Sequence, residues 1–253
     1  MRRGGGLRPL RPGGYSGGGP ETPGPDERDG GAMRPEGAIF DLDGTLTDSM
    51  YIWDEAPRAL VRRFGGRPPE DLARRIKEMG RREASEYMVK TFGLSCTADQ
   101  VMEGVNDIVT VEYREKVPLK PGADALLTRL AELGVPCGIA TASAAFQARD
   151  AMVRLGQWGR FRFAVSCLQY GPKTAPGIYL EAARRLGGRP ERTLVFEDAL
   201  HAARTAKAAG FLVCGVYDPS AAEDQAELRA LSDWYLPRLD DPEFLSRLQQ
   251  TED

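Results

Sequence analysis

From Gly37 onward, short apolar runs alternate with amphipathic stretches of helical periodicity. The apolar runs predict buried strands at residues 37–41, 135–141, 163–166, 193–198, 211–217 and 234–236. The amphipathic stretches between them predict helices at residues 122–133, 144–155, 177–187, 199–209 and 221–231. Alternation of this kind is typical of a parallel sheet covered by helices on both faces. The pattern therefore predicts an α/β fold.

Residues 50–118 interrupt this alternation, because they contain helical stretches and no strand candidate. We interpret them as an all-helical cap domain inserted after the first strand, with hinges near Ser49 and at Pro118–Pro121. The α/β core is then formed by residues 36–49 and 119–253. Met50, Tyr51 and Trp53 begin the cap at helical spacing, and they are expected either to line its underside or to pack inside it.

The first 35 residues differ in composition from the rest of the chain. They are rich in Gly, Pro and Arg and offer little to bury, which predicts a disordered extension at residues 1–35. Met33 stands just before the first predicted strand, so we interpret residues 1–32 as an upstream extension of a protein that starts at Met33. The alternative is a weakly basic tethering tail.

Composition narrows the class of protein. A chain of 253 residues with 42% hydrophobic content can bury a sizeable core, and a net charge of −3 gives no basic field for nucleic acid. No apolar stretch reaches the roughly 18 to 20 residues of a membrane span. The cysteines form no C-x-x-C pair, which favours reduced thiols; they are Cys96, Cys137, Cys167 and Cys214. We therefore expect a monomeric cytoplasmic protein without nucleic-acid or membrane partners.

Polar residues gather where the predicted strands end. They are Asp41 and Asp43 after the first run, Thr141 after the second, Lys173 after the third, and Glu197 with Asp198 after the fourth. Ligands of open parallel sheets bind beyond the carboxyl ends of the strands. Clustered carboxylates repel one another unless a cation neutralises them. A calcium loop does not explain them, since its sixth and twelfth positions would be Leu46 and Ile52.

These residue types predict phosphoryl transfer to an aspartate. Asp41 is the candidate nucleophile, and a hard cation is needed to offset its repulsion from a phosphate. The candidate ligands for Mg²⁺ are Asp41, Asp43, Glu197 and Asp198. Thr141 and Lys173 are candidates to hold the phosphoryl oxygens. Asp43 is placed to protonate the leaving oxygen and then to activate water.

Four motifs resemble those of the haloacid dehalogenase superfamily, in the branch with beta-phosphoglucomutase-like and phosphoglycolate phosphatase-like enzymes. They are D-x-D-G-T at 41–45, the run ending in Thr-Ala-Ser at 141–143, Lys173 before Pro176, and Glu197-Asp198. The resemblance covers about residues 37–239. Ala199 and Ala202 replace the Ser and Gly usual in the fourth motif, but the acidic residues remain.

The resemblance implies a Rossmann-like core with a helical cap, a Mg²⁺ cofactor and a small phosphorylated substrate. It implies that Ala142 joins Thr141 and Lys173 in binding substrate, and that Arg82 in the Gly80–Glu83 loop contacts it from the cap. Each residue also has a structural alternative. Thr141 can cap a helix, Lys173 can be a solvated lysine, and Arg82 can lie on an exposed helix start.

We therefore predict a magnesium-dependent phosphatase that acts on a sugar phosphate-like monoester through an aspartyl-phosphate. Mutases of this branch use a cap histidine, whereas the single histidine here, His201, lies outside the predicted cap. The alternatives are a phosphosugar mutase and a catalytically silent binding protein with the same fold. A receiver-like domain also clusters aspartates at strand ends, but the long helical insertion argues against it.

Overall fold

The computed structural model describes residues 33–76 and 79–248, and these described residues belong to one compact unit. Its sheet has six parallel strands in the order β3-β2-β1-β4-β5-β6. The strands are β1 (Gly37–Phe40), β2 (Cys137–Thr141), β3 (Phe161–Ser166), β4 (Thr193–Glu197), β5 (Leu212–Val216) and β6 (Trp234–Leu236). Each falls within or overlaps a predicted apolar run, so the α/β prediction is confirmed.

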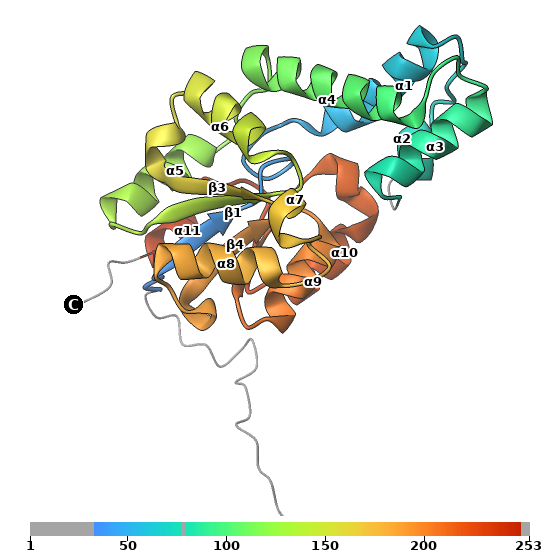
Figure 1. Cartoon of the computed structure of the whole chain (residues 1–253). Coiled ribbons are helices and arrows are strands. Elements are labelled where there is room, and N and C mark those ends of the chain that lie inside the picture. The colour runs from blue at the N-terminus through green and yellow to red at the C-terminus, as the bar shows by residue number, and fades with distance from the viewer. Residues whose placement is uncertain (1–32, 77–78, 249–253) are drawn as a thin grey trace, which may run out of the picture. The chain divides into compact units, whose positions relative to one another are not determined.

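Helices cover both faces of this sheet (Figure 1). They are α5 (Ala123–Glu132), α6 (Ala145–Arg154), α7 (Cys167–Tyr170), α8 (Gly177–Leu186), α9 (Leu200–Ala208), α10 (Gln225–Leu231) and α11 (Pro242–Arg247). Successive strand residues point to opposite faces. Phe40 accordingly packs in the cluster that includes α5, α6 and α11, while Ile39 packs in the cluster that includes α8, α9 and α10. Both are fully buried, which explains why β1 has no polar alternation.

The segment predicted as a cap consists of helices α1 (Met50–Arg63), α2 (Leu72–Ile76), α3 (Arg81–Phe92) and α4 (Ala98–Glu115). It has a small core of its own, formed by Leu60, Val61, Leu72, Met88, Leu94 and Val101. α3 ends at Gly93 in the left-handed conformation, and α4 begins with a capping box between Thr97 and Gln100. Among the described residues of this segment there is no strand.

The last cap helix, α4, is hydrogen-bonded along the core helix α6. Gln147 of α6 donates hydrogen bonds of 2.9 Å to the side chains of Asn106 and Thr110 on α4. Further along the same two helices, Arg154 donates to the carbonyl of Tyr113 at 2.9 Å. α4 is therefore the part of the cap that is most closely tied to the core, and it brings its C-terminal end to the sheet.

The predicted extension at residues 1–35 requires a correction at its end. Residues 1–32 lie outside the described residues. Met33 does not continue a disordered segment, because its side chain is buried in the core and its N–H donates to the Arg247 carbonyl at 2.7 Å. All four cysteines are free. No helix in the described part of the chain has the length and apolar character needed to cross a bilayer.

Candidate active site

Three buried carboxylates meet at the carboxyl ends of β1 and β4. Asp41, Glu197 and Asp198 each offer an oxygen, and these oxygens lie within 4.8 Å of one another. The strand pairing causes this, because Phe40 is in register with Phe196 and the Asp41 N–H donates to the Phe196 carbonyl at 3.0 Å. Residues that follow two neighbouring parallel strands must then lie side by side.

The cluster fits a hard divalent cation. Three carboxylates are the oxygen ligands that Mg²⁺ accepts. The Oε2 atom of Glu197 is buried and has no hydrogen-bond partner, so it is left available as a ligand. Burial, followed by the nearby charges of Glu197 and Asp218, raises the pKa of Asp198 to about 7. Burial likewise raises the pKa of Asp41, against the opposing effect of Lys173. A bound cation would relieve both effects.

Lys173 bridges two of these carboxylates. Its ammonium group donates to Asp41 and, at 2.6 Å, to Glu197, and its side chain is only 7% exposed. Burial opposes its charge, but the ion pairs with Asp41 and Glu197 outweigh burial and raise its pKa. Tyr179 of α8 donates to the same Glu197 oxygen at 2.6 Å. Lys173 is therefore a fixed cation beside the candidate nucleophile, and the alternative of a solvated lysine is wrong.

The carboxylate of Asp43 is held apart from the cluster by hydroxyl groups. Ser49 donates to it at 2.6 Å, Ser143 at 2.9 Å, and Tyr113 of α4 through a short hydrogen bond. The Asp43 carboxylate is not part of the group formed by Asp41, Glu197 and Asp198, and a metal-ligand role for Asp43 stays a prediction. Burial and the charge of Asp43 raise the pKa of Tyr113, which keeps the phenol protonated and able to donate.

The Gly-Thr part of the first motif shapes the turn beneath the cluster. Gly44 has a φ of 81°, and a methyl group on it would collide with the Asp198 carboxylate. Thr45 donates to the other oxygen of that carboxylate at 3.1 Å. Lys120 donates to the Gly44 carbonyl and to Asp218. Glycine is thus required here both by backbone conformation and by the close approach of Asp198.

Thr141 and Ala142 of the second motif were both predicted to bind substrate, and they lie in different surroundings. The Thr141 hydroxyl is fully buried and accepts a hydrogen bond of 2.9 Å from the Ser143 N–H, so it fixes the loop after β2. Ala142, the next residue, lines the cavity described below. A direct contact between Thr141 and substrate stays a prediction.

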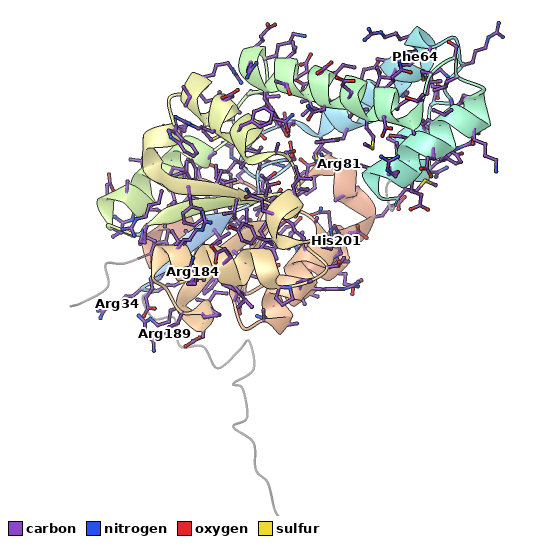
Figure 2. The ribbon with its side chains drawn as sticks, in the orientation of Figure 1. Arg34, Phe64, Arg81, Arg184, Arg189 and His201 are labelled. Carbon is purple, nitrogen blue, oxygen red and sulfur yellow. The ribbon has the colours of Figure 1, made fainter. Side chains whose placement is uncertain are left out.

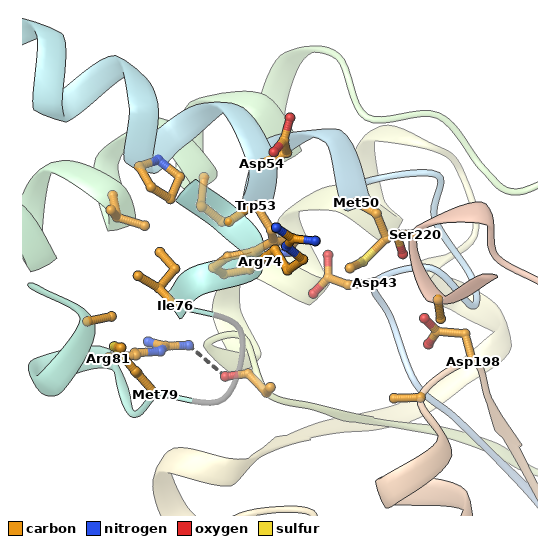
Figure 3. A pocket seen from close by; sticks show the side chains of 18 of the residues that line it. Asp43, Met50, Trp53, Asp54, Arg74, Ile76, Met79, Arg81, Asp198 and Ser220 are labelled. Atoms are coloured by element: carbon orange, nitrogen blue, oxygen red, sulfur yellow. Dashed lines mark hydrogen bonds between the residues drawn. The ribbon is translucent and has the colours of Figure 1, made fainter. Parts of the chain in front are cut away.

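A cavity of about 830 Å³ opens above this sheet edge (Figure 3). Its floor includes the side chains of Asp41, Asp43, Lys173, Glu197 and Asp198. From here on, the sheet edge means this group of five residues. Its opposite side is formed by the described lining residues between Met50 and Val109, which we call the cap wall. Met50 and Trp53 belong to the cap wall, whereas Tyr51 is 47% exposed and donates to Glu112 at 3.0 Å.

Two cap arginines line the cavity, Arg74 and Arg81, whereas Arg82, the arginine predicted to contact substrate, does not. Arg82 is 61% exposed, pairs with Asp99 at 2.7 Å and is not among the residues that line the cavity. Arg81 lines the cavity and donates to the Ala142 carbonyl at 2.7 Å. Figure 2 labels Arg81 on α3 and His201 on α9, and both line the cavity.

Four groups that hold the catalytic candidates in place were not among the predicted site residues: Ser49, Tyr113, Ser143 and Tyr179. Ser143 is the last residue of the second motif and Ser49 lies four residues after the first, and these positions are a usable signal. Tyr113 lies 70 residues from Asp43 and Tyr179 lies 18 residues from Glu197. No local pattern marks either tyrosine, because both contacts are made by helix packing.

Comparison with known proteins agrees with this geometry. Residues 35–210 match the family model of haloacid dehalogenase-like hydrolases. A phosphorylated carbohydrates phosphatase of Thermotoga maritima is 28% identical over 69% of this chain and 82% of its own length. The plasmid-borne protein CbbY of Cupriavidus necator is 31% identical over 81% of this chain and 85% of its own length.

A solved structure shares the observed architecture. The crystal structure of CbbY from Rhodobacter sphaeroides in complex with phosphate superposes with a TM-score of 0.71 and 20% identity. It covers 82% of this chain and 96% of that one, and at this identity it establishes the fold alone. With the family model covering most of the chain and the motif residues gathered at one sheet edge, the chain belongs to the haloacid dehalogenase-like hydrolases.

Proposed function

We propose that this protein is a magnesium-dependent phosphatase that hydrolyses a phosphate monoester of a small metabolite through an aspartyl-phosphate on Asp41. The observation that carries the proposal is the buried group of Asp41, Glu197 and Asp198, with Lys173 fixed beside it. The family assignment supports hydrolysis, and a named phosphatase of phosphorylated carbohydrates is among its relatives.

Asp41, Glu197 and Asp198 would hold the Mg²⁺ ion. When bound, the ion supplies positive charge that offsets repulsion between the carboxylates and an incoming phosphate. Lys173 contributes a second positive charge beside Asp41. Because Lys173 contacts both Asp41 and Glu197, it also restrains the nucleophile relative to the cluster. Its ammonium group can bind a phosphoryl oxygen as substrate arrives.

In the first step an oxygen of Asp41 attacks phosphorus, and the bond from phosphorus to the leaving oxygen breaks. The electron pair goes to that oxygen, which takes a proton from Asp43. In the second step Asp43 removes a proton from water as the water oxygen attacks the same phosphorus. The bond between phosphorus and the Asp41 oxygen breaks, its electron pair returns to the Asp41 carboxylate, and inorganic phosphate leaves. The Ser49 and Ser143 hydroxyls beside Asp43 can donate or accept, so they can serve either protonation state of Asp43.

Phosphate release from a panel of metabolite monoesters tests the proposal. We expect release to require Mg²⁺ and to be abolished in Asp41→Asn, because an amide is not an effective nucleophile. Asp48→Asn is the matched control, since Asp48 is exposed and does not line the cavity. Near-normal turnover by folded Asp41→Asn would remove Asp41 from its role. Full activity in excess chelator would exclude the metal requirement, and sugar-phosphate isomerisation faster than phosphate release would indicate a mutase.

A further inference from the structure

The cap wall is apolar to a degree that the proposed chemistry does not require. Helices α1, α3 and α4 each turn one face, spaced i, i+3, i+4 and i+7, toward the cavity. The apolar side chains on these faces include Met50, Trp53, Met88, Met102, Val105 and Val109. Figure 3 shows Met50 and Trp53, together with Ile76 and Met79, around the cavity that contains Asp43 and Asp198.

The polar residues on the same helix faces are already bonded within the protein. Asp54 pairs with Arg58, Ser85 donates to the Arg81 carbonyl at 2.9 Å, and the Asn106 side-chain oxygen accepts from Gln147 at 2.9 Å. Of the two cap arginines that line the cavity, Arg81 donates to the Ala142 carbonyl at 2.7 Å, and Arg74 on α2 pairs with Asp71 at 3.1 Å. Most of what the cap wall offers a ligand is therefore apolar surface.

A wall of this kind discriminates between substrates. Sugar hydroxyls placed against methionine and valine would lose their hydrogen bonds to water without replacement, which is unfavourable. The faces of a flat ring make few hydrogen bonds to water, so placing such a ring against methionine and valine costs little. Thioether side chains adapt to aromatic faces and make favourable contacts with them. The indole of Trp53 adds a surface on which a ring can stack.

The cavity thus has two zones, polar at the sheet edge and apolar at the cap wall. Ser220 and Glu223, which line the core side, extend the polar zone beyond the carboxylate cluster. A volume of about 830 Å³ lies in the upper part of the range for small-molecule sites, about 300 to 1,000 Å³. Space therefore remains beyond a phosphorylated sugar bound at the polar zone.

We propose that the substrate is a phosphate monoester of a sugar or sugar alcohol that also carries a flat aromatic or heteroaromatic ring. Its phosphate binds at the sheet edge, its sugar hydroxyls lie in the polar zone, and its ring packs against the cap wall. This inference rests on the proposed phosphatase function, because it assigns the phosphate to the carboxylate cluster.

Matched pairs of monoesters test the inference. Ribose 5-phosphate is compared with nucleoside 5′-monophosphates, and ribitol 5-phosphate with flavin mononucleotide. Both members of a pair have the same primary leaving oxygen, so their difference reports the replacement of the C1 hydroxyl by the ring. We expect the ring-bearing member of at least one pair to have a kcat/KM about 10-fold higher, through a lower KM. Equal or higher kcat/KM for the ring-free member of every pair overturns the inference and leaves the phosphatase proposal intact.

Binding separates this inference from the proposed function. The same pairs are titrated calorimetrically into Asp41→Asn in the presence of Mg²⁺. A ring-dependent gain in affinity supports the inference even if the wild type releases no phosphate, a result that would overturn the phosphatase proposal alone. No gain in affinity for any pair overturns the inference.

A polar substitution in the cap wall provides the second test. Met102→Gln keeps the length of the side chain, and we expect it to lower kcat/KM for the preferred ring-bearing substrate about 10-fold with little change for its ring-free partner. Val111→Gln makes a comparable change on the same helix at a residue that is 46% exposed and does not line the cavity, so both substrates should be unaffected. Trp53→Leu is the substitute if Met102→Gln fails to fold. An equal loss for both members of the pair, or no loss, overturns the inference.

Discussion

The sheet edge and the cap wall face one cavity but are built from opposite kinds of contact. At the sheet edge, charged groups are buried and bonded to one another, as Lys173 is to Asp41 and Glu197. At the cap wall, apolar side chains line the space and the polar ones are bonded elsewhere. The proposed reaction depends on a few groups held at fixed positions, whereas the proposed substrate selectivity depends on many side chains that together form one surface.

The elements behind each side explain the difference. Strand pairing fixes Asp41 against the residues that end β4, through the register of Phe40 with Phe196. The cap helices present side chains without such a ladder, and among the described residues it is α4 that is hydrogen-bonded along a core helix, through Gln147 and Arg154. Single substitutions should therefore have large effects at the sheet edge and smaller effects at the cap wall.

After Asp41→Asn, the largest effect is expected for Asp43→Asn, which removes the proposed proton donor. Loss of a positioned proton donor should lower kcat about 10²- to 10⁴-fold. The loss should shrink for an aryl phosphate, whose weakly basic leaving group needs little protonation. Steady-state phosphate release with an alkyl and an aryl substrate measures both values. An equal loss with both leaving groups would reject the proton-transfer role.

Lys120→Met should produce the next largest effect, on stability. Lys120 and Asp218 form an ion pair of 2.5 Å with side chains 11% and 1% exposed. Removing one partner of a buried pair costs about 3 to 5 kcal/mol, because the other charge is left uncompensated. Lys116→Met is the control, since Lys116 is 61% exposed in its pair with Glu112 and should cost less than about 1 kcal/mol. Urea unfolding of both variants gives the comparison, and equal costs would contradict it.

Tyr113→Phe tests whether the cap contributes to the chemistry. The variant removes one hydrogen bond to Asp43, and a bond to a charged group is worth enough to lower kcat about 10-fold. KM should change little, because Tyr113 does not line the cavity. Tyr51→Phe is the matched control, since its hydroxyl contacts Glu112 instead. A change in KM with kcat preserved would show that Tyr113 affects binding rather than the positioning of Asp43.

The sequence was most informative where local geometry determines position. All six strands were predictable from apolar runs, and parallel pairing then brings Asp41 together with Glu197 and Asp198. Tyr113 was not predictable, because its contact with Asp43 depends on how α4 packs against α6.

The cap wall was only half predictable, for a different reason. Helical spacing of apolar residues shows that a face is covered, but not by what. In the cap, Leu60 and Val101 fill its own core, while Trp53 and Met102 line the cavity. A residue in the cap core and a residue that lines the cavity can follow the same helical periodicity. The sequence therefore could not decide whether Trp53 packs inside the cap or lines its underside.

The smallest effect distinguishes two adjacent arginines of the cap. One residue along a helix turns a side chain by about 100°, which carries Arg81 to the cavity and Arg82 to Asp99 on the exposed side. Arg81→Ala removes an exposed hydrogen bond to the Ala142 carbonyl, and a bond of this kind is worth about 0.5 to 1.5 kcal/mol. We expect KM to rise about 3-fold, with kcat nearly unchanged because Arg81 touches none of the carboxylates. Arg82→Ala should change neither constant, since its exposed ion pair contributes little. Steady-state kinetics of the two variants with one substrate decide the matter. A rise in KM confined to Arg82→Ala would restore the sequence-based choice of arginine and contradict the structural one.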